Sequence, residues 1–404
     1  MKSGYLSEYF EAVAAKRLSA VEANPGRSNQ HEYNGVEDLK ALFGKATERH
    51  KFPAHFIYLN DFDYEAISAD AFVTWYDARL RHPTRSEHRL YYPSTPVSQC
   101  ANEGDLLIIG RLSNSHVLIV IAESGSTIEK QLLWLFGFDE ITHPGFSVRG
   151  ELESEQDRIG FAARTVLEAI GIEPEDRDET YLDVMIQRFG RQFPTSRIFS
   201  EFARSTLPDI SPLDNPDAVL LAWLEREEIL FRTLERELVA ERLDQGFSGD
   251  VDGFLSFSLS VQNRRKSRAG ASFENHLEVL FSSRDIRYDR GKTTENKSKP
   301  DFLFPGVSEY NNPEFPETAL TMLAAKSTCK DRWRQALTEA DRIRQKHLAT
   351  LEPAISEAQT DEMRARDLQL VVPESIHETY SQTQRQWLVN LDNFISQVRA
   401  QQGS

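Results

Sequence analysis

The sequence predicts an α/β protein in two parts: a β-rich first half, and a last third in which helices and strands alternate. Residues 54–122 contain five short strand-like apolar runs, and residues 271–372 alternate helical and strand-like patterns. Between them, residues 173–179 form an acidic stretch with a proline, which favours a linker. A chain of 404 residues is long enough for two or three domains.

The first half is expected to open with a helix and to continue with strands. The strand-like runs are residues 54–59, 71–76, 89–92, 106–109 and 116–122. Residues 110–115 have turn chemistry between two apolar runs, so we expect a hairpin there. Successive short strands favour an antiparallel barrel or sandwich. A helix that ends near Gly171 follows.

After the acidic stretch, a long amphipathic helix is expected over residues 217–244, closed by Gly246. The order then becomes helix 271–283, strands 301–304 and 320–325, helix 331–351 and strand 368–372. With the boundary in the acidic stretch, the predicted domains are residues 1–175 and 176–404.

Composition excludes several classes of protein. No apolar run approaches the ~20 residues that a membrane-spanning helix needs, and the first 20 residues lack the apolar core of a secretory signal. We therefore expect a cytoplasmic protein with no membrane partner. The two cysteines form no CxxC pair, which argues against a disulfide framework and a cysteine zinc site.

The net charge of −16 conceals a local basic stretch. Residues 260–300 hold 10 Lys and Arg against five Asp and Glu, while the acidic excess lies between residues 151 and 250. This stretch permits a polyanionic partner, and a solvated charged surface is the alternative.

Two carboxylates and a lysine follow neighbouring elements in the last third. Asp301 starts one predicted strand, Lys326 ends the next, and Glu339 lies in the predicted helix beyond. Such a group fits metal-dependent phosphodiester cleavage, because carboxylates hold Mg²⁺ and an ammonium stabilises charge on the phosphate. The alternatives are a turn residue at Asp301 and an ion pair between Glu339 and Arg342. A charge directly after a buried strand, as at Lys326, needs solvent or a carboxylate partner.

Three charged residues follow this lysine, namely Lys330, Asp331 and Arg332. Lysine and arginine can donate to guanine, and aspartate can accept from cytosine. The trio therefore predicts base reading by a sequence-specific nuclease. A charged helix start capped by Asp331 is the alternative.

Four blocks in this order closely resemble the catalytic domain of EcoRII-type restriction endonucleases. They are SVQNRRKSRAG at 260–270, FENHLE at 273–278, KPDFLFP at 299–305 and AKSTCKDRWRQ at 325–335. The resemblance covers most of residues 250–380, including LVVP at 370–373, and continues more weakly at KRLSA, residues 16–20.

The resemblance implies a restriction-endonuclease-like catalytic core of the PD-(D/E)XK superfamily. In this family the acidic residue usually found beside the lysine is displaced to the next helix, and here position 324 is Ala. It implies that Asp301 and Glu339 bind Mg²⁺, with Glu274 as an outer ligand. Lys326 would act at the scissile phosphate, with Tyr310 near the active site. The DNA-binding residues that we expect in this domain are Lys330, Asp331, Arg332, Arg264, Arg265 and Arg268.

For the first domain, the resemblance implies a β-pseudobarrel that binds a second copy of the DNA site and restrains a catalytic homodimer. Four of the expected contacts lie in RHPTRSEHR, residues 81–89, and the fifth lies 50 residues earlier in the chain. They are Arg81, Arg85, His88, Arg89 and His31.

The leading function is therefore a Mg²⁺-dependent type II restriction endonuclease that cuts double-stranded DNA at a specific site. A methylation-dependent endonuclease of the same fold is one alternative. A non-catalytic DNA-binding regulator is another, which the retained Asp301, Lys326 and Glu339 argue against. An acidic assembly scaffold would leave the basic stretch unexplained.

Overall fold

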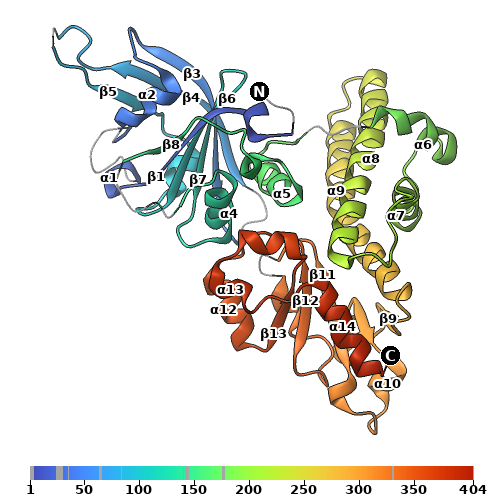
Figure 1. Cartoon of the computed structure of the whole chain (residues 1–404). Coiled ribbons are helices and arrows are strands. Elements are labelled where there is room, and N and C mark those ends of the chain that lie inside the picture. Colours follow the sequence, from blue (N-terminus) through green and yellow to red (C-terminus); the bar gives the residue numbers. More distant parts are fainter. Residues whose placement is uncertain are drawn as a thin grey trace. The chain divides into compact units, whose positions relative to one another are not determined.

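The computed structural model describes residues 4–23, 31–34, 36–62, 66–82, 84–139, 141, 145–174, 178–329 and 332–403. The chain divides into two compact units, coloured from blue to red along the sequence in Figure 1. Unit 1 runs to Pro174 and also contains the later segment Pro353–Gln359. Unit 2 consists of Glu175–Glu352 and Thr360–Ser404. The first crossing between the units thus falls within the acidic stretch at residues 173–179.

Unit 1 is built on one eight-stranded sheet with the order β2-β5-β4-β3-β7-β6-β1-β8. All neighbours are antiparallel except β3 and β7, which are parallel. The strands are β1 Phe10–Arg17, β2 Glu32–Tyr33, β3 His50–Leu59, β4 Ile67–Asp77, β5 His88–Tyr91, β6 Leu106–Leu112, β7 Val117–Ala122 and β8 Ser147–Arg149. The predicted hairpin between β6 and β7 is confirmed by their antiparallel register.

The predicted opening helix is wrong, because residues 10–17 form strand β1 in the sheet interior, between β6 and β8. Six of its eight residues are buried, since both of its faces are covered. Burial on both faces removes the alternation of apolar and polar residues that marks a half-exposed strand. The run of alanines with Lys16 and Arg17 consequently resembles a helix in the sequence alone.

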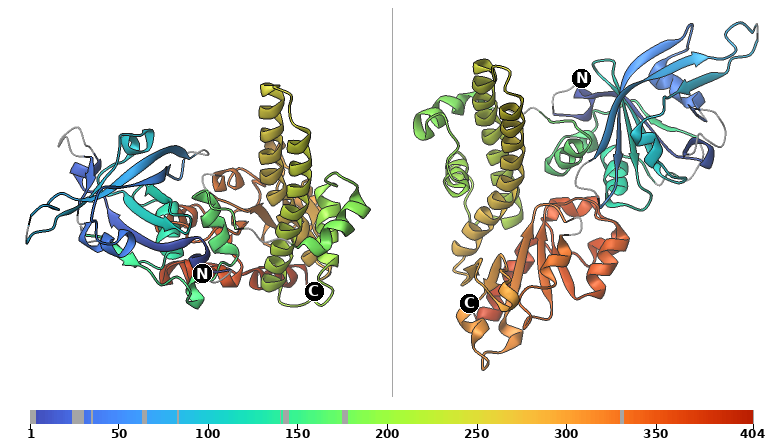
Figure 2. Two further views of the ribbon diagram at one scale, coloured as in Figure 1. Left: turned by 90° about the horizontal axis from the view of Figure 1, so that it is seen from above. Right: turned by 180° about the vertical axis from the view of Figure 1, so that it is seen from behind.

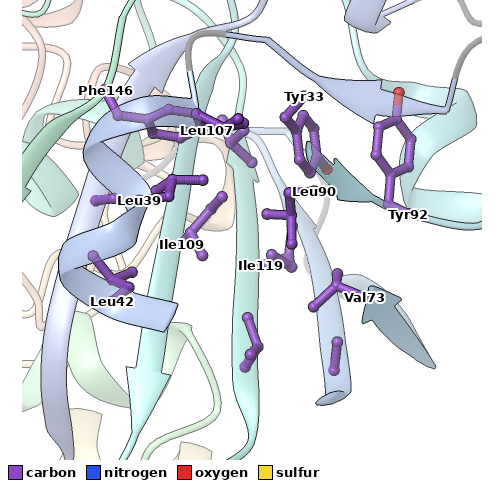
Figure 3. Close-up of a cluster of buried hydrophobic side chains, with 14 of the residues drawn as sticks. Tyr33, Leu39, Leu42, Val73, Leu90, Tyr92, Leu107, Ile109, Ile119 and Phe146 are labelled. Atoms are coloured by element: carbon purple, nitrogen blue, oxygen red, sulfur yellow. The ribbon is translucent and has the colours of Figure 1, made fainter. Parts of the chain in front are cut away.

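The two faces of this sheet carry separate hydrophobic cores. Ile109 and Ile119 belong to one core with Trp75, whereas their neighbours Ile108 and Val120 belong to the other. Figure 3 shows part of the first core, where side chains from the helical segment with Leu39 and Leu42 meet the strands. The helical segments are η1 Leu6–Glu8, α1 Ala20–Ala23, η3 Val36–Leu39, α2 Lys40–Phe43, α3 Pro96–Cys100, α4 Thr127–Leu135, η4 Glu155–Asp157 and α5 Phe161–Ala169.

Hydrogen bonds attach the late segment Pro353–Gln359 to unit 1. Gln131 Nε2 donates to the carbonyl of Pro353 at 3.0 Å, and the Ser356 amide donates to Thr127 Oγ1 at 3.1 Å. These bonds are buried, which makes them costly to leave unmade. A short piece from late in the sequence is therefore an integral part of unit 1.

Unit 2 begins with helices: η5 Glu179–Tyr181, α6 Leu182–Phe189, α7 Ser196–Ser205, α8 Pro216–Gln245 and α9 Val251–Ser282. The α8 helix starts with an Asn215 cap on the Ala218 amide and ends at Gly246, which has a φ of 68°. Its extent agrees with the prediction within a residue at each end. Figure 2 shows α8 and α9 running side by side.

The α9 helix starts twenty residues before the predicted position. Residues 251–271 include no buried residue, and the apolar side chains of this part of α9, such as Phe254 and Leu255, are exposed rather than packed on a core. Residues 236–245 of α8 are likewise unburied. We call these two stretches, with the turn between them, the finger.

Nearer the core, ion pairs join α7, α8 and α9. His276 Nε2 lies 2.9 Å from Glu227 Oε2, and both side chains are fully buried. Arg204 Nη1 lies 3.0 Å from His276 Nδ1, so Nδ1 accepts and the ring proton sits on Nε2, toward Glu227. Burial lowers the pKa of His276. The neutral ring thus links a cation on α7 to an anion on α8.

The remainder of unit 2 is a five-stranded sheet with the order β13-β12-β11-β10-β9. Strands β11, β12 and β13 are parallel to one another. Strand β10 pairs antiparallel with β11 on one side and with β9 on the other. The strands are β9 Asp289–Arg290, β10 Phe302–Phe304, β11 Thr321–Lys326, β12 Lys346–Thr350 and β13 Leu368–Val371. The helical segments are η6 Glu295–Lys297, α10 Val307–Asn311, η7 Glu317–Ala319, α11 Trp333–Ala336, α12 Glu357–Ala365, η8 Glu374–Thr379, α13 Gln382–Arg385 and α14 Leu391–Gln402.

The predicted helix over residues 331–351 is wrong. Only α11 is helical, and the chain then turns and enters β12, a strand between β11 and β13. All five residues of β12 are buried, including Lys346 and His347. A central strand that carries two basic residues does not read as apolar, and the spacing of Trp333, Leu337 and Leu348 fits a helix by coincidence.

In the part of the chain that the structure describes, no helix has both the length and the apolar character needed to cross a membrane.

Candidate active site

Asp301 and Lys326 meet at the end of two antiparallel strands. Phe302 of β10 pairs with Leu323 of β11, so Asp301, one residue earlier, faces the end of β11 where Lys326 lies. Asp301 Oδ2 accepts from Lys326 Nζ at 2.8 Å and from the Ala325 amide at 2.7 Å. The two side chains are 17% and 20% exposed, so the pair is anchored in the sheet yet open at its surface.

Glu339 lies in the turn after α11 and is coupled to the same pair. Burial and the charge of Asp301 raise the pKa of Glu339 to about 7, while Lys326 opposes the shift. Its Oε2 is buried and has no hydrogen-bond partner among the described residues. A buried carboxylate oxygen without a partner is costly, and a bound cation would remove that cost. The structure therefore brings together the three residues predicted from the sequence.

A third carboxylate, Glu274 of α9, is part of this electrostatic group. Burial raises its pKa, and the charge of Asp301 raises it further, whereas Arg290 and Lys326 lower it. Arg290 of β9 lies 2.9 Å from Glu274 Oε2 and 2.7 Å from Glu278 Oε2. No three His, Cys, Asp or Glu side chains among the described residues are grouped closely enough for a ready metal cage.

Arg290 was missed by the sequence analysis. Its guanidinium joins Glu274 and Glu278, which lie one helical turn apart on α9, and donates to Asn275 Oδ1 at 3.0 Å. Arg290 also pairs in register with Phe302, directly beside Asp301. The signal that could have found it is the Glu-x-x-x-Glu spacing on α9, which calls for a nearby cation to offset two like charges.

Tyr310 is buried beside the turn that carries Glu339. It is 1% exposed, and its hydroxyl donates to Glu295 Oε2 at 2.5 Å while accepting from the Arg342 amide at 3.2 Å. Arg342 follows Glu339 by three residues, so these bonds hold the turn that carries Glu339. Burial and the Glu295 carboxylate raise the pKa of Tyr310. Tyr310 is thus placed to orient the turn rather than to touch a substrate.

Of the predicted base-reading trio, Lys330 and Asp331 lie outside the described residues. Arg332 is half-buried at the start of α11, and its amide donates to the carbonyl of Cys329 at 2.7 Å. The Cys329 amide in turn donates to Glu352, at the end of β12. This segment directly follows β11, which ends in Lys326.

The three arginines of α9 predicted to bind DNA have different surroundings. Arg265 lies 2.7 Å from Glu235, and Arg268 forms an ion pair with Glu228, so glutamates of α8 neutralise both. Arg264 lies over the ring of Phe193, with 4.7 Å between the guanidinium carbon and the ring centroid. Two of these three arginines thus join α9 to α8.

In unit 1, Arg81 and Arg85 are exposed, whereas Arg89 of β5 pairs with Glu32 at 3.0 Å and Glu87 at 2.7 Å. His88 is 4% exposed; its Nε2 accepts from the Ala46 amide, and its ring lies against Trp75. This packing gives His88 a structural role. His31 is half-buried between Tyr91 and Tyr92.

Basic and aromatic side chains that the sequence analysis did not single out share one face of the β3–β4–β5 sheet. Arg49 lies over Tyr76 at 4.6 Å, and Lys51 lies over Phe72 at 4.4 Å. Tyr76 pairs across the strands with Arg89. This combination of cations and rings is typical of nucleic-acid-binding surfaces.

Comparison with known proteins identifies the family. The family described as EcoRII C terminal matches residues 231–395. The type II restriction enzyme EcoRII of Escherichia coli is 34% identical over 396 residues, which cover 96% of this chain and 93% of that enzyme. The chain belongs to the EcoRII family of type II restriction enzymes. The resemblance found in the sequence is therefore confirmed, and the activity of the EcoRII family is site-specific DNA cleavage.

Other restriction endonucleases match shorter stretches of this chain. The type II restriction enzyme SsoII of Shigella sonnei is 34% identical over 110 residues, 25% of this chain and 35% of that enzyme. A metal-depleted Ecl18kI complex with uncleaved, modified DNA is 20% identical, with a TM-score of 0.45 over 55% of this chain and 83% of that chain. A PspGI–substrate DNA complex is 17% identical, with a TM-score of 0.45 over 54% of this chain and 95% of that chain.

The ion pairs of Arg290 lead to a prediction. Replacing Arg290 by Gln removes a cation that lowers the pKa of Glu274, so Glu274 is protonated up to a higher pH. Cleavage at neutral pH should fall by roughly tenfold, which corresponds to about 1.4 kcal/mol, and should recover as the pH rises. Arg290→Lys should retain more activity. The measurement is a pH profile of the single-turnover cleavage rate.

Arg287→Gln is the matched control, since Arg287 is exposed and pairs with Glu309. An unchanged pH profile in Arg290→Gln, with DNA binding intact, would refute the assigned role.

Proposed function

We propose that this chain is a Mg²⁺-dependent endonuclease that hydrolyses both strands of DNA at a specific site. The observation that carries the proposal is the coupled group at the ends of β10 and β11. Asp301 and Glu339 share one electrostatic environment, and within the described part of the chain a buried oxygen of Glu339 has no hydrogen-bond partner. Hard oxygen ligands of this kind fit Mg²⁺, which is commonly bound by one or two carboxylates together with substrate phosphates.

Asp301 and Glu339 would hold the metal ion, with Glu274 as an outer ligand. A bound Mg²⁺ would stabilise negative charge on the phosphate and activate water. Lys326 is fixed by Asp301, and its ammonium, partly exposed beside the pair, would stabilise the scissile phosphate. Tyr310 and Arg290 would orient Glu339 and Glu274. We propose that Lys330, Asp331 and Arg332 read bases next to this centre, because they lie four to six residues after its lysine in the chain.

We propose that unit 1 binds a second copy of the DNA site and so regulates cleavage. The support is the face of β3, β4 and β5 that carries Arg49, Lys51 and Tyr76, together with the exposed Arg81 and Arg85. Stimulation of cleavage by an added uncleavable duplex is the corresponding measurement. We propose that the enzyme acts in the cytoplasm, where its DNA substrate is.

We propose that two copies of the chain pair through the finger of unit 2. Val251, Phe254, Leu255 and Leu259 follow one another along α9 at helical spacings and are 45% to 66% exposed. A 21-residue stretch of helix without a buried residue has only marginal stability by itself. The acidic Asp250 and Asp252 lie at one end of this stripe and the basic Arg264 and Lys266 lie beyond the other. If the α9 helix of a second copy lay antiparallel to this one, the apolar side chains of the two helices would meet. The acidic residues of each copy would then lie toward the basic residues of the other.

The catalytic assignment is tested by Lys326→Ala. The variant should bind its specific DNA in Ca²⁺ and cleave in Mg²⁺ at least ~10²-fold more slowly, since it loses one charge-stabilising group. Lys292→Ala is the control, because Lys292 is an exposed lysine of the same unit. Cleavage by Lys326→Ala at a rate near that of the unaltered enzyme would refute the assignment, and absence of cleavage in the unaltered enzyme would refute the function.

The pairing is tested by the double variant Leu255→Glu and Leu259→Glu. The unaltered enzyme should sediment as a dimer and the variant as a monomer, because two buried carboxylates per copy oppose association. Leu213→Glu, at a position 65% exposed outside the finger, should leave the dimer intact. A double variant that remains dimeric would exclude the finger as the interface.

A further inference from the structure

A pocket of about 860 Å³ lies in unit 2 between α8, α9 and the loop that joins α6 to α7. The residues of this loop that line it are Arg191, Gln192, Phe193 and Pro194. Figure 2 shows α6 and α7 beside the pair of long helices. The volume is within the range of about 300–1,000 Å³ for small-molecule sites. Nothing in the proposed cleavage mechanism uses this pocket.

Aromatic rings form its apolar wall. Phe193 and Phe231 stack with ring centroids 4.9 Å apart, and Phe231 is 2% exposed. Phe193 and Phe257 are half-buried and so retain accessible ring surface. Flat apolar surfaces of this kind suit a planar ring, because stacking of a base on an aromatic side chain contributes about 1–3 kcal/mol.

Four arginines line the same pocket, and carboxylates neutralise two of them. Arg191 pairs with Glu237 at 3.0 Å and with Glu241 at 2.9 Å. Arg268 pairs with Glu228. These two guanidinium groups are already engaged, so their contribution to a ligand is a positive potential rather than a free donor.

The other two, Arg242 and Arg264, have no carboxylate within ion-pair distance among the described residues. Arg242 donates to the carbonyl of Gly246 and lies 4.0 Å over the ring of Phe247. The guanidinium of Arg264 lies over Phe193 and has no hydrogen-bond partner among the described residues. In a protein with a net charge of −16, two guanidinium groups without an acidic partner beside one aromatic pocket point to an anionic ligand.

We propose that this pocket binds a nucleotide, with Arg242 and Arg264 on its phosphate and Phe257 against its base. Guanidinium groups match phosphate oxygens in a bidentate manner, and an aromatic ring accepts a base without regard to its sequence. The nucleotide can come from two sources: a free mononucleotide, or a unit of a DNA strand outside the cleaved sequence. Arg264 precedes Glu274 by ten positions on α9, about 15 Å along a helix that rises about 1.5 Å per residue. The pocket is therefore separate from the catalytic centre.

The test is calorimetric titration of the full-length enzyme without divalent metal, using AMP and dTMP. Adenosine, thymidine and inorganic phosphate are the comparison probes. Both monophosphates should bind at least tenfold more tightly than any of the three, because only they fill both halves of the pocket. Arg264→Gln and Arg242→Gln should each weaken the monophosphates at least tenfold. Arg344→Gln, at a side chain 89% exposed in another part of unit 2, should change nothing.

A further variant tests the contact with the base separately from the contact with the phosphate. Phe257→Ala should reduce the preference for AMP over inorganic phosphate while leaving phosphate binding unchanged. Inorganic phosphate that binds as tightly as AMP to the unaltered enzyme would overturn the nucleotide assignment. Absence of monophosphate binding, or equal binding by correctly folded Arg264→Gln, would overturn the site.

Duplexes that carry the recognition site with short or long flanks distinguish the two sources. If the nucleotide belongs to DNA, long flanks should raise affinity in the unaltered enzyme but not in Arg264→Gln, and the long duplex should displace AMP. If it is free, flank length should have no effect and AMP should bind alongside the duplex. None of these measurements depends on catalysis, so they can be made equally in Lys326→Ala, and failure of the cleavage mechanism would not alter them.

Discussion

The carboxylate of Asp301 is the interaction on which the catalytic half of the molecule depends. One oxygen accepts both the ammonium of Lys326 and the amide of Ala325, so a single group fixes the lysine and joins the ends of β10 and β11. The same negative charge raises the pKa of Glu339 and of Glu274, which reach it from a turn and from α9. Elements distant in sequence thus converge on one charged atom.

Nearby cations offset the repulsion among the carboxylates of this group. Lys326 and Arg290 each lower the pKa of a neighbouring carboxylate, whereas burial works against ionisation. Arg290 also joins two glutamates of α9, which ties the long helix to the edge of the sheet. The excess negative charge that remains is the property a divalent cation would balance. In the proposed mechanism, the side chains that would bind the metal are therefore also those that join these elements.

Much of the site could be predicted from the sequence, because it lies at the ends of apolar strands that the pattern reveals. Asp301 and Lys326 bracket β10 and β11, and a charge next to a buried strand is conspicuous. Glu339 was expected on a helix beyond Lys326, from its place in the chain and then from the family resemblance, but it lies in a turn. Arg290 was missed because its role follows from a strand pairing with Phe302, which no local pattern encodes. Strands β1 and β12 were missed because burial on both faces removes alternation.

The direct test of the central role of Asp301 is to measure the pKa values of Glu339 and Glu274 in Asp301→Asn by carbon-13 NMR of the side-chain carboxyls, without metal. Asparagine keeps an oxygen for the Ala325 amide but removes the charge. Both pKa values should fall from those of the unaltered enzyme, because burial remains and repulsion is lost. Asp367→Asn, at an exposed side chain, should change neither. If both pKa values stay the same in a correctly folded Asp301→Asn, then Asp301 does not couple this site and the account is contradicted.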